Sequence, residues 1–157
     1  MNTRTIEIRV RTCGISELSG EEKQWMQAAV AAAEQAYAPY SGLQVGAVAV
    51  LEDGTLVAGS NQENVAYPSG LCAERVALFG AAARYPGVPV KALAAVALRD
   101  GEVLPFITPC GACRQVLLET EERYRRPVRV LLCGSGEVHG VDSAASLLPL
   151  SFGQTFK

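Results

Sequence analysis

The sequence predicts an α/β fold: one mixed sheet that carries helices on both of its faces. Segments with a strand pattern alternate with segments of helical periodicity along the chain, as in layered α/β folds. The segments 90–98 and 128–133 are almost wholly apolar, which is typical of strands in the centre of a sheet. The 157 residues contain no repeat and no linker, so we expect a single domain over residues 1–157.

The N-terminal part of the chain predicts a strand followed by a helix. Apolar residues alternate with charged ones over Thr5–Thr12, which indicates a half-buried strand. Ser19 and Glu22 have the S-x-x-E spacing of a capping box, the signature of a helix start. Apolar residues then recur at helical spacing, and we expect this helix to end before Pro39.

The remaining elements follow from short patterns. VGAVAVL and TLVAGS flank Glu-Asp-Gly, which predicts a β-hairpin. A second helix begins at Cys72 and stops near Pro86, and segment 90–98 supplies a central strand. A third helix is expected roughly over Gly111–Glu122, and VRVLLC is a further buried strand.

Composition and charge exclude several classes of protein. The chain is 49% hydrophobic and 19% charged, so it can bury a core. Its net charge of −2 argues against a surface built to hold nucleic acid, and we interpret the basic run Arg123–Arg126 as a solvated helix end. No apolar run is long enough to span a bilayer, and the charged N-terminus is unlike a secretory signal. We therefore expect a cytoplasmic protein with no membrane partner.

Three cysteines form a pattern that indicates zinc. Pro109 precedes Cys110 and Cys113 in a P-C-x-x-C motif, and Cys72 lies upstream with a glutamate two residues after it. In a reducing compartment, cysteines that are close in sequence point to metal binding or catalysis rather than to disulfides. Three protein ligands leave one position of a tetrahedral zinc ion open for water, as catalytic zinc sites do.

A fourth protein ligand would instead close the site and make it structural. The candidates are Cys13, Cys133 and His139. We interpret Cys13 and Cys133 as packed or incidental cysteines, and His139 as an exposed residue of a glycine-rich turn. The open-site interpretation is therefore preferred.

Two residues beside Cys72 have roles that zinc chemistry would require. Arg75 can donate to a ligand sulfur and so draw charge away from it. Zinc lowers the pKa of a water that it binds, and the carboxylate of Glu74 can take that proton and deliver it to a substrate. A cysteine and a glutamate at i and i+2, with a distant P-C-x-x-C, form the zinc deaminase pattern in its three-cysteine version.

Four segments extend this pattern into a family likeness: AYAPYSGLQVGAVAV, GSNQENVAYPSGLCAER, TPCGACRQVL and LLPLSFG. With them the chain resembles the cytidine deaminase family, of the small homotetrameric type with an all-cysteine zinc site, from about Leu18 to the C-terminus. The resemblance implies a three-layer α/β/α fold with a mixed, mainly five-stranded sheet. Residues 1–15 would be an N-terminal extension that contributes an extra strand.

The resemblance also implies the reaction. One Zn²⁺ per subunit would be held by Cys72, Cys110 and Cys113, with Glu74 as the catalytic proton shuttle and Arg75 beside the ligands. Cytidine and deoxycytidine would be hydrolysed to uridine and deoxyuridine with release of ammonia, a step of pyrimidine salvage. The expected assembly is a homotetramer with active sites at subunit interfaces.

Substrate contacts come from the resemblance as well. Asn61 and Glu63 match positions that bind the ribose hydroxyl, and Ala73 matches the residue whose backbone faces the base. Tyr67 matches a position at a subunit boundary near the active site. Phe152 matches a C-terminal aromatic residue that reaches a neighbouring subunit's site.

The chain departs from the family pattern near the base. Leu43 stands where the family usually has an aromatic residue that packs on the base, so the pocket keeps its apolar wall and is wider. Gln62 replaces an aliphatic residue, and Pro68, Ser69 and Gly70 alter the loop before Cys72. These changes leave open the preference among cytidine, deoxycytidine and N4-substituted analogues.

Three alternatives remain at this point. An enzyme of the blasticidin type would act on an antibiotic or N4-modified cytosine nucleoside, although Asn61 and Glu63 favour a plain ribose. An editing enzyme for nucleic acids would be expected to carry basic grooves and aromatic platforms, whereas this chain is acidic and only 6% aromatic. A non-catalytic zinc protein would need a fourth protein ligand and would be indifferent to the loss of Glu74.

Overall fold

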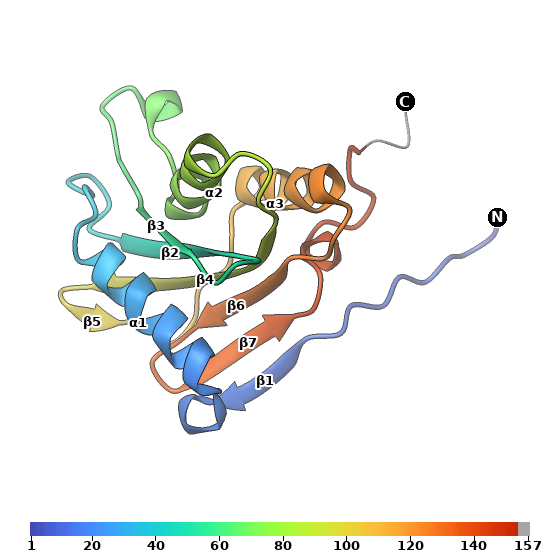
Figure 1. Cartoon of the computed structure of the whole chain (residues 1–157), viewed down its shortest axis with the longest axis horizontal. Helices are drawn as coiled ribbons and strands as arrows, with labels where there is room; N and C mark the ends of the chain where they lie inside the picture. The colour runs from blue at the N-terminus through green and yellow to red at the C-terminus, as the bar shows by residue number, and fades with distance from the viewer. Residues whose placement is uncertain (154–157) are drawn as a thin grey trace.

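The computed structural model describes residues 1–153 and shows one mixed sheet with three α-helices (Figure 1). The strands lie in the order β1-β7-β6-β4-β2-β3, and β5 pairs with β4 beside this path. Only β4 and β6 run parallel, and every other pairing is antiparallel. The strands are β1 Arg11–Gly14, β2 Gln44–Leu51, β3 Leu56–Ser60, β4 Val90–Arg99, β5 Glu102–Val103, β6 Arg129–Cys133 and β7 Glu137–Val141; the helices are α1 Gly20–Ala33, α2 Ala73–Arg84 and α3 Gly111–Tyr124.

The helices make the fold three-layered, as predicted. Helix α1 covers one face of the sheet, and α2 and α3 lie side by side on the other (Figure 1). Two hydrophobic clusters follow this division: one joins α1 to the sheet, and the other joins α2 and α3 to it. Five principal strands, β2, β3, β4, β6 and β7, match the expected five-stranded sheet, and the short β1 and β5 extend it. None of the described helices is long and apolar enough to cross a bilayer.

Two strand glycines set how closely helices approach the sheet. A β-carbon at Gly46 on β2 would lie 1.9 Å from the carbonyl oxygen of Ala29 in α1. A β-carbon at Gly59 on β3 would lie 2.4 Å from the amide nitrogen of Ala77 and 2.7 Å from the carbonyl oxygen of Ala73, both in α2. All three distances are too short for any side chain, so glycine at these two positions lets the helix backbones pack directly on the strands.

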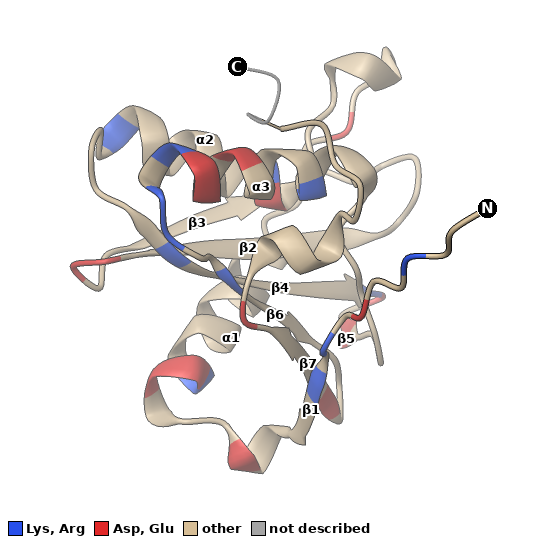
Figure 2. Ribbon diagram, turned by 90° about the vertical axis from the view of Figure 1, so that its right-hand side faces the viewer, with Lys and Arg blue, Asp and Glu red and all other residues tan. Residues whose placement is uncertain are grey.

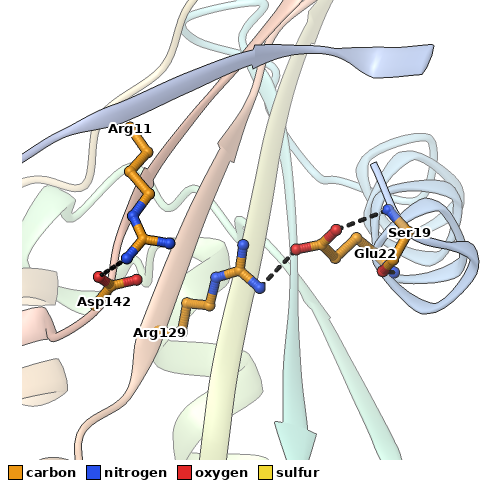
Figure 3. Close-up of polar contacts among 5 residues, drawn as sticks. All are labelled: Arg11, Ser19, Glu22, Arg129 and Asp142. Carbon is orange, nitrogen blue, oxygen red and sulfur yellow. Dashed lines mark hydrogen bonds and ion pairs between the residues drawn. The ribbon is translucent and has the colours of Figure 1, made fainter. Parts of the chain in front are cut away.

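Helix α1 begins as the capping box predicts. The Glu22 amide donates to the Ser19 hydroxyl at 3.2 Å, and the Ser19 amide donates to the Glu22 carboxylate at 2.8 Å. The same carboxylate pairs with Arg129 of β6 at 2.6 Å, which ties the helix start to the sheet (Figure 3). Burial raises the pKa of Glu22, but the Ser19 hydrogen bonds and the Arg129 charge outweigh it, so the pKa lies below its ordinary value.

Two sequence predictions about the sheet edge are wrong. The strand expected over Thr5–Thr12 is formed instead over Arg11–Gly14, and residues 1–10 lie beyond it as an exposed segment without a ladder partner. His139 is not an exposed turn residue, because it lies on β7 with its side chain 23% exposed and its ring against Phe106. The basic run ends α3 as expected, with Arg125 in the left-handed conformation of a helix C-cap.

Candidate metal centre and substrate pocket

The starts of α2 and α3 bring together the residues that the sequence singled out for zinc. Cys72 is the N-cap of α2 and Cys110 is the N-cap of α3, and neither side chain makes a capping hydrogen bond. Cys113 lies one turn into α3 and is fully buried. Because helix N-termini carry partial positive charge, they favour thiolates at these positions.

The three sulfur atoms have the spacing that zinc requires. The Sγ atoms of Cys72 and Cys110 are 3.7 Å apart, those of Cys110 and Cys113 are 3.5 Å apart, and all three lie within 4.8 Å of one another. Tetrahedral coordination with Zn–S bonds of about 2.3 Å places sulfur atoms about 3.8 Å apart. The three sulfurs are too far apart for disulfides and fit a single Zn²⁺ ion.

No fourth protein ligand joins this cluster among the described residues. Cys133 is buried on β6 and Cys13 packs on the same hydrophobic cluster, on the α1 face of the sheet. The cysteine cluster belongs to the α2/α3 face, so the sheet separates the two groups. His139 contacts Phe106 and the carboxylate of Glu137 instead. The geometry therefore fits an open, three-cysteine site.

The positive charge of Arg75 lies beside the thiols of this centre and stabilises the thiolate form of Cys72. The Arg75 guanidinium donates to Cys72 Sγ at 3.6 Å, and its Nε is buried without a hydrogen-bond partner among the described residues. A hydrogen bond from Cys113, joined by those from Arg75 and Cys110, lowers the pKa of Cys72, although burial opposes the shift. The Cys72 contact and burial raise the pKa of Cys113. Cys72 is thus favoured as a thiolate, the form that binds metal.

Glu74 lies in the first turn of α2, with only 3% of its surface exposed. Burial raises its pKa, and the charge of Cys72 adds to the rise. The neighbouring Cys113 thiol and the Arg75 charge act in the opposite direction on this pKa, but they do not cancel the rise. A buried carboxyl with a raised pKa is suited to accept a proton and give it up again.

A cleft of about 470 Å³ opens in front of Cys72 and Arg75. This volume lies within the range of small-molecule sites. Its wall continues along the loop between β3 and α2, where Tyr67 packs edge-to-face on Tyr40 at 6.0 Å between ring centroids. The other lining residues are Ser41, Asn61, Gln62, Glu63, Asn64, Gly70 and Leu71.

Asn61 and Glu63 line this cleft and are held by the loop before β2 and by the start of that strand. The Asn61 amide oxygen accepts from the Val45 amide at 2.7 Å, and its amide nitrogen donates to the Leu43 carbonyl at 2.9 Å. The Glu63 carboxylate accepts from the Tyr40 amide at 2.8 Å and from the amide and hydroxyl of Ser41. The Ser41 and Tyr40 hydrogen bonds lower the pKa of Glu63, so it is ionised near neutral pH.

Ala73, Leu43 and Phe152 are not among the residues that line the cleft, whereas Tyr67 is. Ala73 is fully buried as the first residue of α2, and Leu43 packs against the α2/α3-side core. Phe152 has 77% of its surface exposed, and its carbonyl accepts a hydrogen bond from Gln115 of α3 at 2.8 Å. Tyr67 has 75% of its surface exposed, so both aromatic residues lie on the surface of the molecule.

Tyr40 and Ser41 are site residues that the sequence analysis did not single out. They carry the backbone amides that hold the Glu63 carboxylate. A signal for them exists in Pro39-Tyr40-Ser41-Gly42, a turn-type segment whose glycine has a positive φ of 67°. The loop before Cys72 is held in a similar way, because Gln62 and Leu71 exchange two backbone hydrogen bonds of 2.9 and 3.0 Å.

The fold and the site together define a zinc-binding α/β protein with an open metal position beside a buried carboxyl group. A family profile described as the cytidine and deoxycytidylate deaminase zinc-binding region matches residues 19–126. The chain belongs to this cytidine and deoxycytidylate deaminase family.

Individual relatives agree with this assignment. A cytidine deaminase from Sporosarcina psychrophila is 53% identical over 89 residues, which are 56% of this chain and 61% of that protein. One from Halalkalibacterium halodurans is 41% identical over 99 residues, 63% of this chain and 71% of that protein. The crystal structure of cytidine deaminase from Burkholderia pseudomallei superposes with a TM-score of 0.69 at 44% identity and covers 83% of this chain and 98% of that one.

Proposed function

We propose that this chain is a zinc-dependent cytidine deaminase. It adds water to the C4 position of cytidine or deoxycytidine and releases ammonia, which leaves uridine or deoxyuridine, as a salvage enzyme for pyrimidines does. The observation that carries this proposal is the sulfur cluster of Cys72, Cys110 and Cys113 at the edge of the 470 Å³ cleft, with Glu74 beside it. The named relatives support the substrate class.

The chemistry divides between the metal and the chain. Cys72, Cys110 and Cys113 would hold the Zn²⁺ ion, which would supply a nucleophile at neutral pH by lowering the pKa of a water molecule. A carboxylate oxygen of Glu74 would take the two protons of the water in turn and pass one to N3 of the pyrimidine and one to the 4-amino nitrogen. The C4–N bond then breaks, ammonia leaves and C4 keeps the oxygen. Arg75 donates to Cys72 Sγ and withdraws negative charge from a site that three thiolates would otherwise make strongly anionic.

The proposed ribose contact is supported by the hydrogen-bonding groups of Asn61 and Glu63 that remain unused within the chain. The Asn61 side chain has two N–H donors, and the bond to Leu43 uses one. The Glu63 carboxylate has four acceptor positions, and Tyr40 and Ser41 occupy three. One donor and one acceptor remain on two residues that line the same cleft, which suits a sugar hydroxyl that both accepts and donates.

The assembly belongs to the same proposal. The chain forms a cytoplasmic homotetramer in which Phe152 of one subunit reaches the site of a neighbour and Tyr67 lies at the boundary. The exposure of both residues, 77% and 75%, is compatible with this, because a neighbouring subunit can reach them. Size-exclusion chromatography coupled to light scattering would contradict it by showing a fully active monomer.

The test of the activity is the fall in ultraviolet absorbance when zinc-loaded protein is mixed with cytidine and, separately, with deoxycytidine. Wild-type protein should consume both substrates, whereas Glu74→Gln should keep its zinc and lose turnover. The ratio of kcat/KM for the two nucleosides reports what Leu43 and the 68–70 loop do to the pocket.

Absence of reaction with both nucleosides, in folded protein that holds zinc, would contradict the proposed substrates. Turnover of N4-modified or antibiotic cytosine nucleosides would then identify the alternative. If the zinc-loaded protein is inert toward every amino-pyrimidine, the remaining interpretation is a non-catalytic zinc protein.

A further inference from the structure

Residues 1–10, here called the N-terminal arm, extend from β1 at the edge of the sheet (Figure 1). Every residue of the arm is exposed, and the ladder with β7 begins only at Arg11. The ion pair between Arg11 and Asp142, 2.7 Å long, fixes the point where the arm leaves the body (Figure 3). The arm therefore has a defined origin and direction but no partner strand within the described chain.

The arm nevertheless has the sequence of a strand. Its apolar residues Ile6, Ile8 and Val10 alternate with charged ones, and they remain 51%, 46% and 50% exposed. In an extended chain these three side chains lie on one face. Glu7 and Arg9 lie on the other face, and Figure 2 shows basic and acidic positions alternating along the arm. A strand pattern without a partner, continuous with an open sheet edge, is a template for pairing with another chain.

We propose that the arms of two copies of this chain pair as antiparallel strands about a two-fold axis at Ile8. In this register Ile8 faces the partner's Ile8, and Ile6 faces the partner's Val10. Glu7 faces the partner's Arg9, and by symmetry Arg9 faces the partner's Glu7. Each pairing joins apolar to apolar or acidic to basic side chains, which is the arrangement that stabilises cross-strand pairs.

Neighbouring registers do not have this complementarity. An axis at Glu7 places two carboxylates opposite each other, and an axis at Arg9 places two guanidinium groups opposite each other. An axis at Val10 places Arg9 opposite Arg11, and axes between residues pair apolar with charged positions. Like charges directly opposite each other destabilise a sheet, so the register centred on Ile8 is selected.

The same register continues onto the body of each subunit. Beyond the axis, the partner's Thr5 faces Arg11 of β1, the partner's Arg4 faces Thr12, and the partner's Thr3 faces Cys13. Strand β1 is the end of the sheet, with β7 on its other side, so its outer edge is open to receive this segment. The two sheets become one continuous sheet through the paired arms. This interface is independent of the metal centre and of the proposed reaction.

Cysteine cross-linking in the full-length protein tests the register. Antiparallel partners have Cα atoms about 4.5–5.5 Å apart, within the range that a disulfide spans. Ile8→Cys should therefore form an interchain disulfide under mild oxidation. Ile6→Cys is the matched control, because its own copy lies about 13 Å away in this register. Wild-type protein, oxidised in parallel, reports any contribution of the native cysteines. Equal cross-linking of both variants, or of neither, would overturn the proposal.

Charge variants test the complementarity without new cysteines. Glu7→Arg and Arg9→Glu each create two like-charge contacts and should weaken arm-mediated association on the order of tenfold, measured by sedimentation velocity across a dilution series. A mixture of the two single variants restores both ion pairs and should associate as wild type does, as should the double variant Glu7→Arg/Arg9→Glu. Single variants that associate like wild type would refute the pairing, and so would a mixture that behaves no better than its components.

Discussion

Helices α1 and α2 lie on opposite faces of the sheet, and the side chains at their starts have different roles. At α1 the hydroxyl of the N-cap Ser19 accepts from the Glu22 amide, and the Glu22 carboxylate accepts from the Ser19 amide. At α2 the N-cap is Cys72, whose sulfur makes no capping bond and instead lies 3.7 Å from the sulfur of Cys110. The first arrangement completes a helix, and the second leaves side chains available for a ligand.

The two buried glutamates of these turns show the same contrast. Glu22 has fixed partners in Ser19 and Arg129, and its pKa falls despite burial. Glu74 is more deeply buried, and burial raises its pKa. A carboxylate whose charge is held by fixed partners serves the structure, whereas one whose pKa is raised by burial is suited to take up a proton and release it in catalysis. Environment rather than residue type separates the two roles.

The largest expected effect is on zinc content, and it should differ between a cysteine on the α2/α3 face of the sheet and one on the α1 face. Cys110→Ala removes one of three zinc ligands, so zinc content should fall from about one per chain to near zero and activity should be lost. Cys133→Ala, on the α1 face, should keep both, because burial raises the pKa of the Cys133 thiol to about 12 and it stays protonated. Elemental analysis after dialysis against a weak chelator measures zinc content. Zinc loss in Cys133→Ala would mean that the faces are not separate.

The next effect compares the glutamates. Glu74→Gln should lower kcat by about 10²–10⁴-fold with zinc content unchanged, since it removes only the proton carrier. Glu22→Gln should keep its activity and lose stability by about 1–2 kcal/mol, because it weakens the cap and the Arg129 pair. Steady-state kinetics and urea unfolding of both variants measure the two losses. Equal loss of kcat in both would remove the distinction between a catalytic and a structural carboxyl.

Sequence alone predicted the α1 start and the zinc cluster for different reasons. The capping box is local, so the three-residue spacing of Ser19 and Glu22 already contains the contact. Cys72 and Cys110 are 38 positions apart, and only the chemistry of three cysteines with a glutamate indicated that the fold brings them together. Their meeting depends on α2 and α3 lying side by side, which no local pattern encodes.

Two elements could not be predicted because pairing decides them. The alternation over residues 5–12 is a strand pattern, yet β7 pairs only with Arg11–Gly14, so the pattern before Arg11 has no neighbour in the chain. Segment 137–141 is short and contains a glycine, and β6 and β1 on either side make it a strand. The hydrogen bonds of Asn61 and Glu63 to the 40–45 loop likewise link segments that are distant in sequence.

A smaller loss of stability is expected when α1 or α2 is pushed away from the sheet. Gly46→Ala and Gly59→Ala each push a β-carbon into a helix backbone and should destabilise the fold by about 2–3 kcal/mol. Only Gly59→Ala displaces α2, which carries Glu74, so it should also lower kcat/KM in the fraction that stays folded. Thermal unfolding and kinetics on both variants make the comparison. A Gly59→Ala enzyme with full kcat/KM would show that the site tolerates movement of α2.

The smallest expected effect is the pH dependence of the α1 anchor. The pKa of Glu22 lies below its ordinary value of 4.5 in the folded protein, so its contribution to stability is present above that value and is lost as the pH falls through the folded pKa. Arg129→Met should cost about 1 kcal/mol at pH 7, and the cost should shrink toward pH 3 as Glu22 becomes protonated. Arg126→Met is the matched control, because its exposed ion pair with Glu52 should contribute almost nothing at either pH. Urea unfolding at the two pH values measures the difference, and a cost for Arg129→Met that does not change with pH would show that the Glu22 charge does not anchor α1.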